Sequence, residues 1–561
     1  MGQKIVIIGG VACGPKAAAR ARRRDPEAEI TIVEKRDYVS YASCGLPYYV
    51  GGTVPQINEL THTSFGCCRD VAYFDAIKNI KVIVETEAVS IDREAKKVKL
   101  KNVKTGEESE LPYDKLVMAT GARPKSLPVP GTDLDNVWNL WGMGDADQMR
   151  QKIEAGEADR ICVIGAGLIG LEAAEALMNQ AVDVTMVEFM PQVLFNALDR
   201  DMAVLVNDAL MAENVVLRLG EKVTAIEGDG KVQKVVTDKG EIETDGVLIA
   251  VGAQPNIELA KDSGLELGET GAIKVGPDML TSDPDIYAGG DCVEDTHIVT
   301  KKKVWIPLGS VANMHGRVIG DNLTGGSSEY PGVLGTGIMR TLGTNVASTG
   351  ITEAKAKDLG YDAVSGMGPF TDKSHYYPGG KNITIKIVAD KKDGKVLGVQ
   401  VVGPGDVARV VDAGVTALTK GATLDDIGYM DFAYAPPFGV PIEPLSQTAN
   451  ILRNKLDGIA SSIGPLAIRE LLETDEEVLL LDVRTPEECE KRPGISDSRC
   501  QNIDMAVIRK ELDKLPKDKK VVVVCQLGQR AYDVSTALKG AGFEKTQYLE
   551  GGLNVFERSG D

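Results

Sequence analysis

Two cysteines of this chain stand in sequence settings that favour sulfur chemistry. The first opens the phrase Cys44-Gly45-Leu46-Pro47-Tyr48, in which Pro47 is compatible with the start of a helix. A cysteine at a helix N-terminus gains thiolate character from the exposed backbone N–H groups. The pattern therefore predicts a nucleophilic thiol at Cys44.

The second cysteine, Cys525, follows the apolar run 521–524 and precedes a helix predicted from about Ala531. A loop between a strand and a helix N-terminus can ring a sulfur with backbone N–H groups and stabilise an anionic persulfide. Four residues separate Cys525 from Arg530, whereas a protein phosphatase needs five to fit phosphate. The tighter loop favours bound sulfur, with Arg530 as part of the site.

Two βαβ patterns in the sequence are typical of nucleotide-binding sites. In the first, Gly9 and Gly14 bracket a turn, which also contains Gly10, whose backbone can approach a pyrophosphate at a helix N-terminus. Glu34 is spaced to accept hydrogen bonds from ribose hydroxyls, although Val11 replaces the middle glycine of the usual motif. An ordinary βα turn is the alternative interpretation.

The second pattern is complete. Gly165, Gly167 and Gly170 form G-x-G-x-x-G after a strand and before a helix, and Glu188 ends the next strand. A carboxylate there accepts from both ribose hydroxyls of NAD and repels a 2′-phosphate. The pattern predicts NADH, with NADPH as the alternative, and two such sites suggest hydride transfer between two nucleotides.

A phrase at 281–291 adds a resemblance. Together with the first glycine turn and Glu34, it resembles the flavoprotein pyridine nucleotide–disulfide oxidoreductases. In that family its aspartate, here Asp291, binds the ribitol of FAD; a helix-capping aspartate is the alternative. Thr120 and Gly121 lie in a phrase that is repeated at 250–253. Both phrases are predicted to be chain crossings, and these two residues are expected at the cofactor.

The redox centre around Cys44 differs from that of the two-cysteine members of this family. They carry Cys-x4-Cys, but Tyr49 stands where the partner of Cys44 would be, and no histidine here precedes a proline to form their His-Pro acid. Both departures resemble the single-cysteine subfamily of coenzyme A-disulfide reductases and their NADH oxidase, peroxidase and persulfide reductase relatives. The resemblance covers about residues 1–450. A lone thiolate must pair with an external thiol or cycle through sulfenate or persulfide.

Coenzyme A-type members complete each active site with tyrosines of the partner subunit, which implies a homodimer. The matching phrases contain Tyr376, with Tyr377 as the fallback, and Tyr434; these are predicted to donate protons to a leaving thiolate or sulfide. A core aromatic is the alternative for each.

Coenzyme A itself would need basic contacts. Arg20 and Arg23 lie on nearly one face of the first helix and suit its phosphates, with a solvated basic face as the alternative. Ser40 and Ser43, beside Cys44, complete the predicted substrate site.

The C-terminal hundred residues resemble the rhodanese domain. Besides the Cys525 loop, residues 480–488 and 548–553 match phrases of that fold, while residues 493–503 lack a histidine that is common there. A catalytically silent rhodanese-like fold is the alternative.

The remaining thiols carry weaker expectations. Cys13 and Cys292 are predicted to be small apolar fillers near FAD, and Cys162 lies on a buried strand. The vicinal pair Cys67-Cys68 is favoured as structural or incidental over a redox or metal site. Cys489 and Cys500 are unassigned, and no metal site is predicted.

Composition limits the partners. With 82 acidic against 63 basic side chains the formal charge of the 561 residues is −19, which argues against nucleic acid or an anionic membrane. Nine cysteines are too few for a secreted disulfide scaffold, and the first apolar run is too short for a signal peptide. A soluble cytoplasmic protein is predicted.

Together these features predict an α/β protein. The expected domains are an FAD domain (1–119 and 246–325), an NAD(P)H domain (120–245), an α+β dimerisation domain (326–448), a linker (449–464) and a rhodanese domain (465–561). The expected reaction is NAD(P)H-dependent reduction of polysulfide, persulfide or coenzyme A persulfide to sulfide through FAD and Cys44, with Cys525 carrying sulfane sulfur. Coenzyme A-disulfide reduction or NADH oxidation is one alternative, and a low-turnover sulfur carrier or redox-sensing flavoprotein is another.

Overall fold

The computed structural model describes residues 2–556, so residue 1 and residues 557–561 of the first and last predicted domains lie outside it. The chain divides into two compact units, Met1–Phe189 with Glu221–Val333, and Met190–Gly220 with Leu334–Asp561. The segment Met190–Gly220, although inside the range predicted for the NAD(P)H domain, groups with the second unit.

A parallel sheet with the strand order β18-β7-β1-β2-β3 forms the core of the first nucleotide-binding domain. Its strands are continuous apolar runs because both faces of a parallel sheet are covered. The strands are β1 (Lys4–Ile8), β2 (Glu29–Val33), β3 (Lys81–Ile83), β7 (Lys115–Met118) and β18 (Ile286–Ala288).

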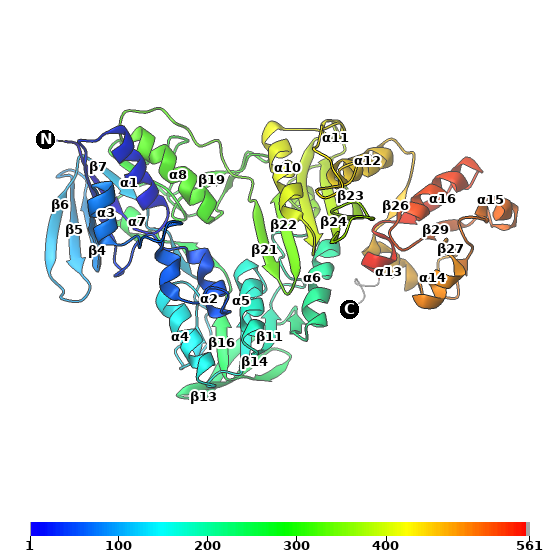
Figure 1. Cartoon of the computed structure of the whole chain (residues 1–561), viewed down its shortest axis with the longest axis horizontal. Coiled ribbons are helices and arrows are strands. Elements are labelled where there is room, and N and C mark those ends of the chain that lie inside the picture. Colours follow the sequence, from blue (N-terminus) through cyan, green and yellow to red (C-terminus); the bar gives the residue numbers. More distant parts are fainter. Residues whose placement is uncertain (1, 557–561) are drawn as a thin grey trace. The chain divides into compact units, whose positions relative to one another are not determined.

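Helices α1 (Cys13–Arg24) and α8 (Gly309–Asn322) run side by side next to this sheet (Figure 1). Glycines allow the close approach: a Cβ on Gly316 would lie 2.5 Å from the carbonyl oxygen of Cys13, and one on Gly320 would lie 2.7 Å from that of Ala17. This packing fixes the N-terminus of α1 beside the first glycine turn. Two shorter helices, α3 (Val71–Lys78) and α7 (Glu258–Asp262), belong to the same domain.

The second nucleotide-binding domain repeats the arrangement. Within this unit its parallel strands follow the order β11-β10-β16-β9. Helix α5 follows the central strand, and α2 of the Cys44 segment packs on α5 (Figure 1). The elements are β9 (Val137–Trp138), β10 (Arg160–Ile164), β11 (Asp183–Glu188), β16 (Gly246–Ile249), α2 (Leu46–Val50), α4 (Met143–Glu154) and α5 (Leu168–Asn179).

Antiparallel strands complete the first unit. After the two predicted chain crossings, β8 and β17 pair with each other, with Ala253 opposite Pro124, so the two crossings lie side by side. Two three-stranded sheets and one further pair are also present. These strands are β4 (Thr86–Asp92), β5 (Lys97–Asn102), β6 (Glu108–Pro112), β8 (Ala122–Pro124), β13 (Val223–Asp229), β14 (Lys231–Thr237), β15 (Gly240–Glu243), β17 (Ala253–Pro255), β19 (Asp295–Thr296) and β20 (Lys303–Val304).

The second unit begins with a five-stranded antiparallel sheet in the order β21-β22-β25-β24-β23, against which α10 and α12 pack. The predicted linker 449–464 begins inside α12, whose Ala449 and Leu452 are fully buried. The elements are α6 (Arg200–Ala212), β12 (Val216–Leu219), β21 (Gly337–Thr341), β22 (Thr344–Gly350), α9 (Glu353–Asp358), β23 (Ala363–Thr371), β24 (Asn382–Asp390), β25 (Val396–Gly403), α10 (Val407–Lys420), α11 (Leu424–Gly428) and α12 (Pro444–Leu456).

A buried charge cluster ties α6 to this sheet. Lys386 of β24 is 2% exposed, and its Nζ lies 2.8 Å from Asp201, 3.3 Å from Asp199 and 3.2 Å from Glu353. Although burial opposes the charged form, the three carboxylates raise the pKa of Lys386 above its usual value. This cluster explains why the α6 segment groups with the second unit.

The C-terminal domain is a parallel sheet in the order β26-β30-β29-β27-β28. Alternate residues of β29 enter two separate apolar cores, Val521 and Val523 on one face and Val522 and Val524 on the other. The elements are β26 (Ser462–Ile463), α13 (Pro465–Leu472), β27 (Val478–Asp482), α14 (Pro486–Lys491), β28 (Cys500–Asn502), α15 (Ile508–Glu511), β29 (Lys520–Val524), α16 (Gln529–Gly540), β30 (Thr546–Leu549) and α17 (Gly552–Phe556).

These domains confirm the predicted α/β class with two dinucleotide-binding folds. Among the described residues, no helix has the length and apolar character needed to cross a bilayer.

Candidate active sites

The first glycine turn has no room for side chains. Gly9 adopts a φ of +112°, and a Cβ there would lie 2.1 Å from the carbonyl oxygen of Ala119. A Cβ on Gly14 would lie 2.0 Å from the carbonyl oxygen of Gly9. The turn therefore presents bare backbone at the start of α1, which fits the pyrophosphate of a dinucleotide.

Glu34 fastens this turn. Its Oε2 accepts a hydrogen bond from the backbone N–H of Gly10 at 2.8 Å, and its Oε1 accepts one from that of Arg36 at 3.0 Å. Glu34 is 4% exposed. The carboxylate thus has a structural role at the position where sequence reasoning predicted a ribose contact.

The second turn repeats this geometry. Gly165 has a φ of +106°, a Cβ on Gly170 would lie 2.0 Å from the carbonyl oxygen of Gly165, and the N–H of Ala166 donates to Oε2 of Glu188 at 2.7 Å. Gly167 caps α5, and a Cβ added to it would meet no atom within 4 Å. The open space beside Gly167 fits a second dinucleotide.

The residues expected near FAD lie around the end of β7. The hydroxyl of Thr120 donates to the carbonyl oxygen of Asn256 at 2.9 Å, and Gly121 has a φ of +66°. Asp291 is half-buried, and its carboxylate forms no hydrogen bond or ion pair with the residues that the structure describes. Burial raises its pKa, which His315 partly offsets. A half-buried carboxylate without a protein donor fits a ribitol hydroxyl.

Cys44 lies in a 3₁₀ turn, Ser43–Gly45, directly before α2, and its side chain is exposed. A Cβ on Gly45 would lie 2.4 Å from the side chain of Leu60, so this turn is packed from behind. Loss of hydration raises the pKa of the Cys44 thiol, and the negative charge of Glu172 raises it further.

Both effects act against the thiolate character that the sequence predicts for Cys44. The helix after Cys44 has only five residues, so the favourable effect of its N-terminus on the pKa of the thiol is small. A hydrogen bond from Ser43 favours the thiolate but does not reverse the shift. Ser40 adopts a φ of +52° and its N–H donates to the carbonyl oxygen of Gly10 at 2.7 Å, which joins the Cys44 loop to the first glycine turn.

The two predicted coenzyme A arginines differ. Arg20 Nε lies 2.6 Å from the carboxylate of Asp321 on α8, so its charge is paired within the chain. Arg23 is exposed and forms no ion pair among residues 2–556. Of these two arginines, only Arg23 has a guanidinium that is not already in an ion pair and can bind a phosphate.

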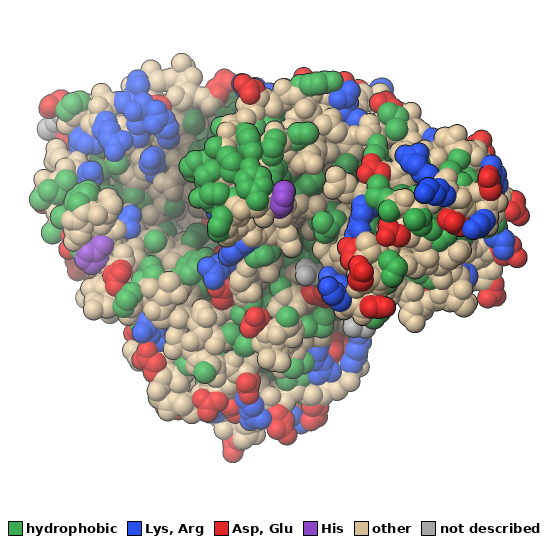
Figure 2. All heavy atoms as spheres, turned by 45° about the vertical axis from the view of Figure 1, so that its right-hand side comes forward, with side chains coloured by type: hydrophobic (Ala, Val, Ile, Leu, Met, Phe, Trp, Pro, Cys, Tyr) green, Lys and Arg blue, Asp and Glu red, His purple; other side chains and the backbone are tan. Residues whose placement is uncertain are grey.

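The predicted tyrosines lie in the second unit, on the loops between β23 and β24 and before α12. Tyr376 is 64% exposed and Tyr434 is 45% exposed, and the ring of His375 meets that of Tyr376 edge-to-face. Tyr377 and Phe438 are exposed as well. Figure 2 shows hydrophobic side chains gathered on one face beside a histidine. Exposed aromatics of this kind mark an interaction surface rather than a core.

The Cys525 loop forms a sulfur cradle. The backbone N–H groups of Gly528 and Ala531 point at Cys525 Sγ, at 3.2 and 3.3 Å. Gly528 has a φ of +87°, which turns its N–H inward. Arg530 faces the same sulfur and is held by two hydrogen bonds to Glu488 of α14, at 2.7 and 2.8 Å. The loop thus concentrates donors on one buried sulfur.

Further contacts hold the backbone of the Cys525 loop in place. The N–H of Leu553 donates to the carbonyl oxygen of Cys525 at 2.9 Å, and a Cβ on Gly552 would lie 2.6 Å from the carbonyl oxygen of Gln526. Arg484 is fully buried, pairs with Asp482 at 2.8 Å and donates to the side chain of Gln526 at 3.1 Å.

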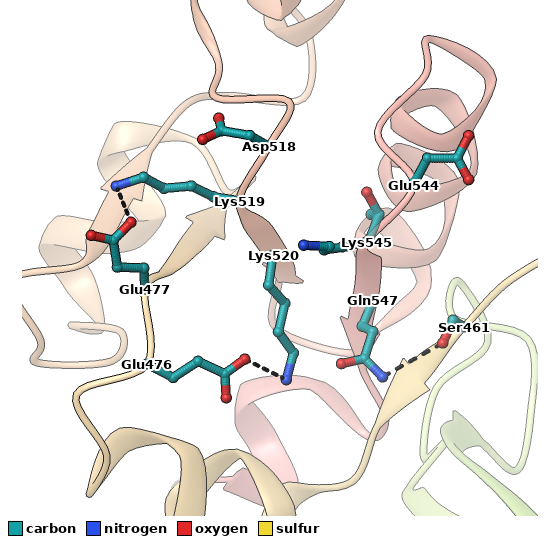
Figure 3. Close-up of a pocket in the computed structure, with 10 residues that line it drawn as sticks. Ser461, Glu476, Glu477, Asp518, Lys519, Lys520, Glu544, Lys545 and Gln547 are labelled. Atoms are coloured by element: carbon teal, nitrogen blue, oxygen red, sulfur yellow. Dashed lines mark hydrogen bonds and ion pairs between the residues drawn. The ribbon is translucent and has the colours of Figure 1, made fainter.

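A separate pocket of about 660 Å³ lies at the opposite ends of the same strands. Figure 3 shows its charged side chains around the start of β29, with Lys519 paired to Glu477 and Lys520 to Glu476. Sites in open parallel sheets lie at the carboxyl ends of the strands, where Cys525 is found. This pocket is therefore not the sulfur site.

The other thiols lie as follows. Cys13 and Cys292 are buried, which is compatible with their predicted filling role, and Cys162 is buried on β10. Cys67 and Cys68 lie in a short loop, and the backbone of Cys68 pairs with that of His62 in an isolated antiparallel β-bridge. Cys489 Sγ lies 3.7 Å from Asp482, and Cys500 lies on β28.

Sequence reasoning missed Glu172 and Glu488. Glu172 lies far along the chain from Cys44, whose pKa it raises, and Glu488 lies 42 residues before Arg530, which it orients. The one available signal was the phrase 480–488, whose last residue is Glu488.

Three family models match the chain: pyridine nucleotide-disulphide oxidoreductase over residues 3–316, the dimerisation domain of that family over 342–443, and a rhodanese-like domain over 465–559. The chain belongs to the pyridine nucleotide-disulphide oxidoreductases and ends in a rhodanese-like domain, as predicted. FAD and NAD(P)H are the cofactors of this family, and the glycine turns and Asp291 described above fit them.

Particular relatives are also similar. The NAD(P)H sulfur oxidoreductase (CoA-dependent) of Pyrococcus furiosus is 38% identical over 451 residues, which cover 80% of this chain and 99% of that protein. An NAD-dependent persulfide reductase from A. fulgidus is 44% identical with a TM-score of 0.94, covering 99% of this chain and 100% of that one. The reduced CoADR-RHD of Bacillus anthracis is 33% identical with a TM-score of 0.93, covering 100% and 98%.

Proposed function

We propose that this chain reduces sulfane sulfur, as polysulfide, persulfide or coenzyme A persulfide, to sulfide at the expense of NAD(P)H. The observation that carries the proposal is the pairing of two different sulfur sites in one chain: an exposed thiol at Cys44 and a persulfide cradle at Cys525. The similarity to a persulfide reductase over 99% of the chain supports it.

Cys44 performs the sulfur chemistry. Bound FAD supplies reducing equivalents from NAD(P)H to this centre. The Cys44 thiolate attacks the inner sulfur of a persulfide, a mixed disulfide forms on Cys44, and sulfide leaves. Since Tyr49 occupies the position of a second cysteine, the mixed disulfide persists until it is reduced.

Cys525 carries sulfane sulfur to or from that reaction. A persulfide at Cys525 is an anion at neutral pH, and the N–H groups of Gly528 and Ala531 with Arg530 supply the donors that stabilise it. Glu488 keeps Arg530 oriented while partly neutralising its charge, so the persulfide can also leave.

Coenzyme A is the proposed thiol carrier, with Arg23 and the serines beside Cys44 as its contacts. The similarity to a CoA-dependent sulfur oxidoreductase supports this assignment. Glu188 is proposed to favour NADH over NADPH, because a carboxylate at the end of this strand would repel a 2′-phosphate.

The working form is proposed to be a homodimer. Residues 342–443 match a dimerisation domain, and the exposed aromatic loops carrying Tyr376 and Tyr434 suit a surface that a second copy covers. In such a dimer these tyrosines would donate protons to leaving groups at the partner's Cys44 centre. The domain ranges given above from the sequence are proposed with this assignment.

Coenzyme A-disulfide reduction is the second candidate. Its specific support is the lone exposed Cys44, which can form a mixed disulfide with coenzyme A from either substrate. In that case the Cys525 domain would have no part in turnover.

Steady-state NADH consumption by the full flavin-loaded protein should be compared with inorganic polysulfide, coenzyme A persulfide, coenzyme A disulfide and oxygen as acceptors. The proposal requires the highest kcat/KM with polysulfide or coenzyme A persulfide, and sulfide as product. A preference for coenzyme A disulfide, unchanged by Cys525→Ser, would establish the second candidate. Flavin reduction by NADH without turnover on any sulfur acceptor would indicate a carrier or sensor.

A further inference from the structure

The turn that carries Cys44 has little local structure to hold it. The 3₁₀ turn Ser43–Gly45 and helix α2 (Leu46–Val50) have no side-chain hydrogen bond at their N-termini. A helix of five residues is not stable by itself, because too few hydrogen bonds offset the ordering of its backbone. The position of the Cys44 sulfur therefore depends on contacts that other elements make with this segment.

Tyr49, the fourth residue of α2, ties this helix to α4 (Met143–Glu154), which packs beside it (Figure 1). The Tyr49 hydroxyl donates to Oδ1 of Asp147 at 2.7 Å, and Tyr49 is 7% exposed. Burial and the bond to Asp147 raise the pKa of Tyr49 to about 12, so the hydroxyl keeps the proton that it donates. Asp147 is oriented in turn by the side-chain amide of Gln151, which donates to its Oδ2 at 2.8 Å.

Arg150, one turn further along α4, holds α2 at its C-terminal end. Its Nη1 donates to the carbonyl oxygens of Tyr49 and Pro55, both at 3.1 Å. The guanidinium also lies 4.6 Å from the centre of the Tyr49 ring, within the range of a cation–π contact. A cation at the end of a helix is favourable, because the last carbonyl groups have no partner inside the helix. Tyr49 is thus held through its hydroxyl, its ring and its carbonyl group.

Two further tyrosines, which precede the 3₁₀ turn, contact the residues around the start of α4. The Tyr41 hydroxyl donates to the carbonyl oxygen of Trp141 at 3.0 Å, and the Tyr38 hydroxyl accepts from the N–H of Met143 at 3.2 Å. The rings of the two tyrosines meet edge-to-face, with 5.1 Å between their centres. The chain on both sides of the turn is thus fastened to α4 and the residues before it.

We propose that Tyr49 is a positioning residue for the Cys44 reaction. Its bond to Asp147 holds α2 against α4 and so keeps the Cys44 sulfur at one place, both when the thiolate attacks a persulfide and when the mixed disulfide is reduced. This inference rests on the proposed function, but it assigns a task to a residue that takes no part in the sulfur chemistry itself. Reduction of bound FAD by NADH does not need this contact, so the two half-reactions should respond differently to its loss.

The contact is tested first without turnover, by amide hydrogen exchange in α2 of the flavin-loaded protein. Tyr49→Phe removes the hydroxyl and keeps the ring that Arg150 contacts, so exchange should be about two- to tenfold faster, the range that one hydrogen bond contributes. Tyr73→Phe is the matched control, because Tyr73 lies on α3 of the same unit and its hydroxyl forms no hydrogen bond with the described residues. Equal exchange in these two variants would overturn the proposal.

Asp147→Ala tests the same bond from the other side and keeps the tyrosine in place. It removes the acceptor, so it should accelerate exchange in α2 by a similar factor. The double variant Tyr49→Phe/Asp147→Ala should exchange no faster than the faster single variant, because both changes remove one and the same bond. Additive effects of the two substitutions would show that they act separately and would overturn the proposal.

The positioning role is tested by separating the two half-reactions. Bleaching of the flavin by NADH should proceed at the wild-type rate in Tyr49→Phe. When the reduced protein is mixed with coenzyme A persulfide, the sulfide burst should be at least about threefold slower, since a displacement of about 1 Å can lower a rate about 10²-fold. Equal losses in both half-reactions, or a wild-type burst, would overturn the proposal. No sulfide from the wild type would contradict the proposed function instead, and the exchange result would still decide whether Tyr49 holds α2.

Discussion

Gly528 is the residue on which the sulfur cradle depends most directly. Its φ of +87° is a conformation that costs a residue with a side chain about 1–2 kcal/mol. A Cβ there would lie 3.3 Å from the carbonyl oxygen of Leu549 and 3.5 Å from the nitrogen of Gly552, so the site is tight but not closed. In Gly528→Ala the loop is expected to relax by rotating the peptide, which turns the N–H away from Cys525 Sγ.

The magnitude follows from the hydrogen bond that is lost. This N–H lies 3.2 Å from the sulfur, and a hydrogen bond to a charged group contributes about 1.5–3 kcal/mol. The Cys525 persulfide should therefore be destabilised roughly 10- to 150-fold.

The assay is sulfur transfer from thiosulfate to cyanide by the full chain, in a Cys44→Ser background that leaves Cys525 as the acceptor. Gly540→Ala is the matched control, because Gly540 ends the same helix α16 with no atom within 4 Å of its Cβ position and no positive φ. The control should keep wild-type transfer. If Gly528→Ala also kept it, the backbone donors would not be what stabilises the persulfide.

Three further outcomes are expected. Lys386→Met leaves the buried Asp199 and the partly buried Asp201 and Glu353 without their cation, and it should lower the free energy of unfolding by about 3–5 kcal/mol, read as at least a hundredfold faster amide exchange in β24 and α6. The exposed Lys392→Met should leave this exchange unchanged. Equal exchange in the two variants would refute the role of the ion cluster in holding α6 to the sheet. Glu188→Ala should narrow the preference for NADH over NADPH. It should also raise the KM for both nucleotides, because the turn at Ala166 loses its hydrogen bond to the carboxylate. An unchanged ratio of the KM for NADPH to the KM for NADH would argue against a role of Glu188 at the ribose. Since the pKa of Cys44 is raised above its usual value, the thiolate becomes more abundant as pH rises, and the mixed-disulfide step should accelerate from pH 7 to beyond pH 9; a flat profile would contradict that shift.

Local patterns predicted the parts of the site that local backbone geometry forms. The glycine turns, the Cys525 loop and the lone Cys44 each depend on residues within a few positions of one another, so spacing alone was informative. The internal repeat of the two nucleotide-binding folds was also legible, and the structure extends it to Glu34 and Glu188, which fasten their turns in the same way.

The features that the sequence did not predict depend on tertiary packing between residues far apart in the chain. Helix α2 lies close against α5 because Gly51 and Gly52 have no Cβ, and the sequence pattern gave no sign of that contact. The expected thiolate at Cys44 has the same explanation. The sequence shows a helix N-terminus after Cys44, but it does not show the burial and the Glu172 charge that raise the pKa of the thiol. Arg20 illustrates the converse: its spacing suggested a phosphate contact, but Asp321 on a helix some 300 residues later pairs with it.

The central claim is that Cys44 is the thiol through which NAD(P)H reduces sulfane sulfur. The most direct measurement compares Cys44→Ser with wild type in two readouts on the same flavin-loaded samples: bleaching of the flavin by NADH and NADH-dependent sulfide production from polysulfide. The account predicts flavin bleaching at close to the wild-type rate and sulfide production lowered by at least about a hundredfold. Full sulfide production by Cys44→Ser would contradict it.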